Sequence, residues 1–362
     1  MRADSSDVTM ALARAGRFRV LAEAVLVGRS LEPAAATHAM RSTDDELASL
    51  LWAAFAVRAR HFGRRVKLCV LNNARSGLCP EDCGYCSQSA VATSDIPRYR
   101  LKPVTELLAA AHAAARAGAR RYCMVTSARG PSAADIAHFA RAARQIRAEL
   151  PDIELCVSLG LMEDAAASSL RAAGVDFVNH NLNTSRRFYP EICSTHTYDD
   201  RLATVGSAKR AGLKLCSGVI VGMGETDEDL VDVALELGQL EPISLPVNFL
   251  IPIEGTPLGE REPPPVGRCL RALAVFRLTN PRAEIRAAGG RERALGNAQP
   301  LALYPANSIF MDGYLTTPGQ QREAAVAMIA AHGFDVDAGD PPGDTPAVPA
   351  AMDDRPHVGG MV

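Results

Sequence analysis

Residues 76–87 of this 362-residue chain read Ser-Gly-Leu-Cys-Pro-Glu-Asp-Cys-Gly-Tyr-Cys-Ser. They place Cys79, Cys83 and Cys86 at the spacing C-x3-C-x2-C. Thiolates held this close by a loop that contains proline and glycine can converge on one metal centre. A structural zinc site and an ordinary cubane iron–sulfur cluster each take four protein ligands. Three local thiols therefore indicate a cluster with one iron left open for a ligand that is not protein.

Two other interpretations of the cysteines stay open at this point. A zinc site could take a remote fourth ligand such as Cys69 or His61, and the three thiols could be unrelated residues of a turn. The spacing, with Tyr85 just before the last cysteine, resembles the cluster motif of the radical S-adenosylmethionine (SAM) enzymes. In that superfamily the open iron of a [4Fe-4S] cluster is chelated by the amino and carboxylate groups of SAM. The resemblance favours this chemistry.

Composition limits the classes of function. The net charge is −2, with 39 basic and 41 acidic residues interspersed, so no basic footprint for nucleic acid is expected. No apolar run approaches the roughly 18 residues of a membrane span, and no secretion signal is evident. Nine cysteines then fit a reducing compartment, where thiols serve metals or catalysis. We expect a cytoplasmic protein that binds neither nucleic acid nor membrane.

The middle of the chain repeats the pattern strand, loop, helix. The predicted strands are 67–71, 121–126, 154–159, 176–181, 214–221, 244–251, 284–287 and 303–310. The predicted helices are 104–117, 132–150, 163–173, 198–211, 225–238, 266–278 and 320–332. Strands that alternate with helices favour parallel pairing, most economically in a closed (β/α)8 barrel of the TIM type, with an open doubly wound sheet as the alternative. The stretch 289–300 has little pattern, so its helix is the least certain element.

Three regions follow from this pattern. Residues 1–62 are predicted to form an N-terminal helical extension, with helices at 9–27 and 46–62, that packs on the barrel. Residues 63–334 form the barrel itself. Residues 335–362 are rich in Pro, Gly and Asp without apolar periodicity, so a disordered tail is expected there.

A second set of unusual residues lies inside the predicted strands: Cys123, Cys156, Cys216 and Arg286. Inward residues from different strands of a barrel meet in layers, so these four can converge although they are far apart in sequence. A single buried cysteine is more often a small core residue. A buried guanidinium, however, needs compensating charge or acceptors, and a sulfide cluster bound by thiolates offers both. Cys69, Cys193 and Cys269 fit no such pattern and are interpreted as structural or incidental.

With both sets placed, the chain resembles the biotin synthase family of the radical SAM superfamily, from about Leu47 to Gly333. The resemblance rests on separate stretches, which are 77–89, 178–185, 216–226, 246–250, 255–258, 286–292, 306–310 and 315–317.

The resemblance implies specific cofactor ligands. Cys79, Cys83 and Cys86 match the ligands of the [4Fe-4S] cluster, and the second set matches the ligands of a [2Fe-2S] cluster that donates sulfur. The residues alone do not predict arginine as an iron ligand. Further matches imply contacts to SAM and to substrate: Tyr85, Asn181, Asn183 and Arg201 for SAM, and Asn179, Asn248, Thr316 and Thr317 for substrate.

The three asparagines in this set carry two further expectations. The asparagines at 179, 181 and 183 alternate along one predicted strand and should share a face. Asn183 stands where many members have aspartate, and its amide can still bind a ribose hydroxyl, but without charge.

The implied reaction is sulfur insertion into dethiobiotin to give biotin. A 5′-deoxyadenosyl radical from SAM abstracts hydrogen, and the [2Fe-2S] cluster supplies sulfide. The implied partners are a flavodoxin- or ferredoxin-type electron donor and a second copy of the chain in a homodimer. Another radical SAM reaction, such as hydrogenase maturation or methylornithine synthesis, shares the first motif but does not need the second set. A zinc- or iron-binding regulatory protein without turnover leaves the barrel-facing polar residues without a role.

Overall fold

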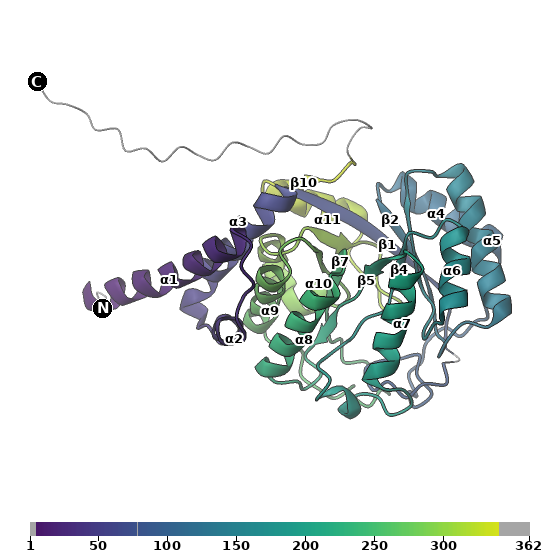
Figure 1. Ribbon diagram of the computed structural model, residues 1–362, viewed down its shortest axis with the longest axis horizontal. Coiled ribbons are helices and arrows are strands. Elements are labelled where there is room, and N and C mark those ends of the chain that lie inside the picture. Colours follow the sequence, from purple (N-terminus) through teal and green to yellow (C-terminus); the bar gives the residue numbers. More distant parts are fainter. Residues whose placement is uncertain (1–4, 78, 340–362) are drawn as a thin grey trace, which may run out of the picture.

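The protein is a closed barrel of parallel strands surrounded by helices (Figure 1). The computed structural model describes residues 5–77 and 79–339. Neighbouring strands follow the order β1-β2-β3-β4-β5-β7-β8-β9, and β9 pairs back with β1, so the sheet closes. The prediction of a TIM-type barrel is therefore confirmed, and the open sheet is excluded.

The element bounds agree closely with the predicted alternation. The strands are β1 (Arg65–Arg75), β2 (Arg121–Thr126), β3 (Glu154–Ser158), β4 (Phe177–Asn179), β5 (Lys214–Cys216), β6 (Val219–Val221), β7 (Ser244–Phe249), β8 (Glu284–Ala287), β9 (Ser308–Phe310) and β10 (Asp335–Val336). The barrel helices are α4 (Val104–Arg116), α5 (Ala133–Glu149), α6 (Asp164–Ala172), α7 (Tyr198–Arg210), α8 (Asp227–Leu240), α9 (Val266–Thr279), α10 (Arg291–Leu295) and α11 (Arg322–Ala331).

The N-terminal extension consists of α1 (Ser5–Leu26), α2 (Pro33–Met40) and α3 (Leu47–Phe62). Helix α3 buries Leu50, Leu51, Ala54 and Phe55, the stripe expected from its periodicity, and it packs against both α1 and α9. Figure 1 shows α1 projecting away from the barrel. The extension therefore adds a layer outside the helical ring and does not reach the barrel interior.

A short strand outside the barrel ring follows α11. After α11, Gly333 adopts a positive φ of 71° and turns the chain back toward β1. Arg65 and Val66 then pair with Asp335 and Val336 of β10. Ordered chain thus continues past the expected boundary at 335, and the rest of the predicted tail, from 340 onward, lies outside the described residues.

The predicted strand at 303–310 is much shorter than expected. Residues Gly296–Leu303 form a 3-10 helix that contains Pro300, and only Ser308–Phe310 pair as β9. Pro305, inside the predicted range, lacks the N–H that a ladder position needs, so the pairing begins only after it. The uncertain stretch before it contains the short helix α10.

The fifth barrel strand is interrupted at Ser217 and Gly218, which separate β5 from β6. The pairing with β7 keeps its register across the gap, from Cys216 with Ser244 to Val219 with Val247. A Cβ atom on Gly218 would lie 1.8 Å from the carbonyl oxygen of Pro246. Only glycine allows the two backbones to approach this closely.

We therefore expect Gly218→Ala to destabilise the barrel by about 2 kcal/mol or more, because the clash is with backbone and cannot be relieved by a rotamer change. Gly206→Ala, inside α7, is the matched control, because its Cβ would meet only the flexible end of Arg210. That control should be neutral or stabilising by up to about 1 kcal/mol. Urea unfolding of both variants checks the expectation, and equal stabilities would contradict it.

The start of α8 contains a buried carboxylate. Asp229 accepts hydrogen bonds from the Ser185 hydroxyl at 2.6 Å and from the backbone N–H of Thr226 at 2.8 Å, and it also pairs with Arg187. Burial raises the pKa of Asp229, but these hydrogen bonds outweigh that effect, so the pKa lies below its ordinary value.

Asp229→Asn is expected to lower the free energy of unfolding by about 2 kcal/mol at neutral pH. The pKa of Asp229 is lower in the native state than in the unfolded state. The stabilisation by Asp229 is therefore complete at pH values above the ordinary carboxyl pKa, and it disappears as the pH falls through the native pKa. Urea unfolding at pH 7 and at decreasing pH should show the two proteins converging in acid. Asp199→Asn is the control, because its pair with Arg186 is exposed and contributes little. A difference for Asp229→Asn that is independent of pH would contradict the argument.

Candidate active site

A cavity of about 260 Å³ inside the barrel brings the two predicted cysteine sets together. All of the residues predicted from the sequence as cluster, SAM or substrate contacts line it. Its wall combines strand residues that point inward with the loop that follows β1. The convergence expected from the parallel barrel is therefore present, although the role of each residue stays a prediction.

The first cysteine loop follows β1 and is held by backbone contacts. The N–H of Gly84 donates to the carbonyl of Ile192 at 2.9 Å, and the N–H of Cys86 donates to the carbonyl of Cys83 at 3.1 Å. Burial raises the pKa of Cys86 to about 11. Such a thiol gives up its proton when a metal ion binds it. Three thiols that one loop presents to the same cavity are a suitable donor set for an iron–sulfur cluster.

Acidic residues of the same loop anchor it to a neighbouring segment. The Asp82 carboxylate accepts hydrogen bonds from the backbone N–H groups of Ser194 at 3.0 Å and Thr195 at 3.2 Å. The Glu81 carboxylate binds Arg129 at 2.9 Å. Sequence reasoning did not identify these contacts, because the two segments are more than a hundred residues apart.

The second cysteine set is formed by strands β2, β3 and β5. Cys123 and Cys156 are direct neighbours in the β2–β3 register, and both belong to one cluster of buried residues with Cys216 and Phe177. Cys156 and Cys216 are each only 1% exposed. Three buried thiols that cluster inside the barrel form a donor set that fits a second cluster.

Arg286, on β8, completes this set. Its Nη1 lies 3.9 Å from the Cys216 sulfur, while its other nitrogens bind Ser308 at 3.0 Å and Ser244 at 3.1 Å. Glu284 also contacts Arg286. Nη1 is thus the nitrogen that faces the thiols, and the remaining bonds hold the guanidinium plane in place.

Glu284 is the compensating charge that a buried arginine requires. It accepts two further hydrogen bonds from Arg121, at 3.2 and 3.0 Å, and Lys67 lies 3.3 Å from it. The sequence predicted a sulfide cluster bound by thiolates as the compensation and did not identify Glu284. The alternation of Glu284 and Arg286 on one face of β8 was the available signal.

The three asparagines line the cavity, but the backbone that carries them is not the regular strand that was predicted. Strand β4 ends at Asn179, whose Nδ2 lies 3.2 Å from the Cys216 sulfur. Asn183 lies beyond the strand with a positive φ of 72° and pairs with Val219 in an isolated bridge. The prediction that all three share one regular strand was wrong, and asparagine is among the residues that tolerate this backbone conformation. The Asn183 amide donates to the Tyr85 hydroxyl at 2.6 Å.

Other predicted contacts are also held by the protein itself. Arg201 is buried on α7 and donates from Nη1 to the Asn181 carbonyl at 2.8 Å. Asn248 donates to the Val219 carbonyl at 2.9 Å and accepts from the Gly289 N–H at 3.0 Å, so one Nδ2 hydrogen stays available. Thr316 lies 2.8 Å from the Ser87 hydroxyl, which joins the far side of the cavity to the first cysteine loop.

The remaining thiols occupy distinct places. Cys69, considered as a fourth zinc ligand, contacts Ser308 at 3.5 Å beside Arg286. His61 lies in the last turn of α3, on the N-terminal extension. Cys193, interpreted from sequence as incidental, instead places its sulfur 3.8 Å from that of Cys83.

Comparison with known proteins agrees with this architecture. Residues 75–237 match the family model described as Radical SAM superfamily, and residues 246–335 match the Biotin and Thiamin Synthesis associated domain. The solved structure of a methylornithine synthase superposes with a TM-score of 0.77 at 21% identity, covering 87% of this chain and 97% of that one. At this identity the likeness is one of fold. The fold and the cysteine loop define a radical SAM enzyme.

Sequence relatives narrow the family. Biotin synthase 2 of Frankia casuarinae is 52% identical over 298 residues, covering 82% of this chain and 83% of the relative. A biotin synthase of Thermus thermophilus is 48% identical over 317 residues, covering 87% of this chain and 96% of the relative. The chain belongs to the biotin synthase family. Its relatives and its radical SAM domain support a [4Fe-4S] cluster and SAM as cofactors. Among the described residues, no helix combines the length and the apolar character of a membrane span.

Proposed function

We propose that the chain converts dethiobiotin to biotin by radical SAM sulfur insertion, with a [2Fe-2S] cluster as the sulfur donor. The observation that carries the proposal is the cavity that joins the loop of Cys79, Cys83 and Cys86 to the strand thiols beside Arg286. A radical SAM reaction of another kind needs only the first set. The second set, buried in one cluster inside the barrel, supports a sulfur-donating cluster.

The residues divide the work as follows. Cys79, Cys83 and Cys86 would hold the [4Fe-4S] cluster, whose open iron would supply a binding site for SAM and the electron for its reductive cleavage. The strand set of Cys123, Cys156, Cys216 and Arg286 holds the [2Fe-2S] cluster that supplies the sulfur atom.

The polar wall between the two sets positions SAM and substrate. Asn181, Asn183, Tyr85 and Arg201 line the SAM side, and Arg201 is placed to pair with a carboxylate. On the substrate side, the free Nδ2 hydrogen of Asn248 suits a ureido oxygen, while Asn179, Thr316 and Thr317 line the path to the strand thiols. A closed barrel excludes water from reactive radicals and fixes the distance between reacting atoms.

The partners follow from the family resemblance. We expect a flavodoxin- or ferredoxin-type protein as electron donor, a homodimer, and a cytoplasmic location. The cysteines of the described residues are free thiols rather than disulfides, which supports a reducing compartment.

The test is anaerobic reconstitution with iron and sulfide, followed by absorption and Mössbauer spectra and iron counting. Wild type should show [4Fe-4S] and [2Fe-2S] signals, whereas the Cys123→Ala/Cys156→Ala variant should keep only the first. Dethiobiotin turnover is then assayed on both proteins. A wild type that holds only a cubane cluster, with turnover unchanged in the double variant, would remove the sulfur-donor assignment.

A further inference from the structure

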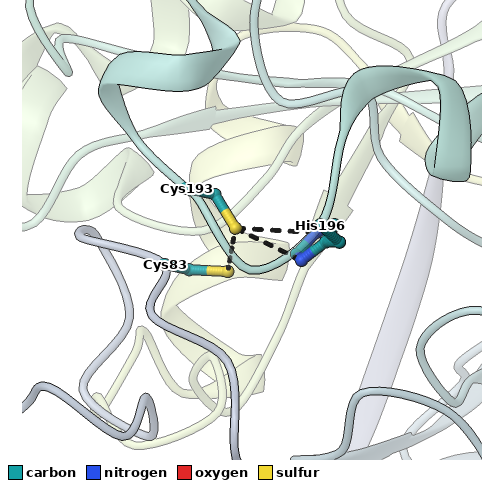
Figure 2. Close-up of side chains that lie close together, drawn as sticks. All are labelled: Cys83, Cys193 and His196. Atoms are coloured by element: carbon teal, nitrogen blue, oxygen red, sulfur yellow. Dashed lines mark hydrogen bonds between the residues drawn. The ribbon is translucent and has the colours of Figure 1, made fainter.

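Cys193 and His196 form, with Cys83, a compact group of metal-binding side chains beside the first cysteine loop. Figure 2 shows the three side chains directed toward one another from two segments of the chain. Their potential ligand atoms all lie within 4.8 Å of one another, and each residue is buried. Neither Cys193 nor His196 has a role in the proposed reaction.

The backbone holds Cys83 and Cys193 face to face. On one side the N–H of Gly84 binds the carbonyl of Ile192 at 2.9 Å, and on the other the N–H of Ser194 binds the Asp82 carboxylate at 3.0 Å. These contacts bracket the pair, so the position of the two sulfurs is fixed by the segments that carry them.

The separation of the sulfurs suits one tetrahedral ion. Two thiolates each 2.3 Å from a tetrahedral zinc ion lie roughly 3.8 Å apart. The distance between the Cys83 and Cys193 sulfurs is 3.8 Å. A disulfide, by comparison, needs the sulfurs at about 2.05 Å. The separation of the two sulfurs therefore matches that of two thiolates that share one ion.

His196 supplies the third donor. Its Nδ1 lies 3.2 Å from the Cys193 sulfur. Its Nε2 lies 2.8 Å from the Tyr189 hydroxyl and 2.9 Å from Arg201 Nη2. A histidine that binds metal through one nitrogen usually donates a hydrogen bond from the other nitrogen to a neighbouring acceptor. Binding through Nδ1 leaves the proton on Nε2, which then donates to the Tyr189 hydroxyl, and the hydrogen bond that Arg201 Nη2 now donates to Nε2 must be given up.

The fourth position faces a carboxylate. Glu81 contacts Nδ1 of His196 in the present arrangement, so a carboxylate lies on the histidine side of the group. Sulfur and imidazole donors in tetrahedral geometry favour zinc among the common divalent ions. Both thiols bind as thiolates, so loading one ion releases their protons to the solvent.

We propose that, when the first cluster is absent, Cys83, Cys193 and His196 bind one Zn²⁺ ion. The exclusion of cluster by ion rests on the proposed function, because it requires Cys83 to be a ligand of the [4Fe-4S] cluster. One sulfur cannot serve both sites in the described geometry. Zinc at this position would therefore hold the protein in a form that cannot assemble its first cluster.

The test uses the full chain carrying Cys79→Ala and Cys86→Ala, which removes the competing thiols of the first loop but keeps the proposed site. Anaerobic, metal-free protein is titrated with Co²⁺, whose tetrahedral thiolate complexes are coloured, and Zn²⁺ is then added to displace it. The same titration is made after adding Cys193→Ser. The matched control is Cys269→Ala in the same background, a buried thiol on α9 outside the cavity.

The Cys193→Ser addition should remove one equivalent of coloured Co²⁺ complex or weaken it by at least about 100-fold, whereas the Cys269→Ala addition should change nothing. X-ray absorption is measured on the Zn²⁺ forms with and without Cys193→Ser. The difference between the two spectra should correspond to a site with two sulfur ligands. Circular dichroism confirms that each variant is folded. Equal Co²⁺ spectra with and without Cys193 would overturn the site, whatever the outcome of the biotin assay.

Exclusion is tested separately with all three loop cysteines present. Reconstituting the [4Fe-4S] cluster should abolish the Co²⁺ signal that depends on Cys193. If that signal coexists with a full complement of cluster iron, the mutual exclusion is wrong.

Discussion

Cys79→Ala is expected to abolish reductive cleavage of SAM. The loop offers three thiols for a cluster with one open iron, so losing one leaves too few protein ligands to hold it. Removing a group that merely supports a metal ligand already costs up to about 100-fold in activity. Loss of a ligand should therefore reduce 5′-deoxyadenosine formation by more than about 100-fold. Chromatographic detection of 5′-deoxyadenosine and methionine, with a chemical reductant, makes the measurement independent of the electron donor.

Iron counting separates this result from misfolding. The Cys79→Ala protein should lose about four irons per chain and keep the absorption of the second cluster. Cys269→Ala removes a buried thiol outside the cavity and should retain both cleavage and iron. Undiminished cleavage in the Cys79→Ala protein would show that the first cluster is held elsewhere.

The sequence predicted the barrel well because the hydrophobic periodicity of the strands and helices agrees with the positions of the glycines that end the helices. Strands β2 and β8 have the predicted bounds, and Gly118, Gly174 and Gly212 follow helices with positive φ, as their C-cap positions required. Inward-facing residues on parallel strands must meet, so the convergence of Cys123, Cys156 and Cys216 followed from topology alone.

The failures have local physical causes. The break after β5 depends on the approach of Gly218 to Pro246, which lies in another strand, and the path of Asn183 depends on a bridge to Val219. Neither contact leaves a periodic signal in the sequence. The same holds for Cys193, because only the tertiary pairing of its segment with the first loop brings it to Cys83.

The largest effect on the second half of the reaction is expected for Cys156→Ala. This thiol belongs to one buried cluster with Cys123 and Cys216 and is almost fully buried, so its loss removes one donor of the set. SAM cleavage should stay detectable, because the first loop is intact. Biotin formation should fall by more than about 100-fold, together with the [2Fe-2S] absorption.

Cys69→Ala is the decisive comparison, since Cys69 is also a buried thiol that lines the same cavity, yet its described contact is with Ser308 rather than with the three thiols. Both substitutions remove one sulfur and leave a cavity of similar size. If the strand cysteines were only core residues, the two variants would lose stability alike and keep turnover alike. A selective loss of biotin formation in Cys156→Ala, with SAM cleavage preserved in both, can be explained only if the sulfur of Cys156 takes part in holding the donor.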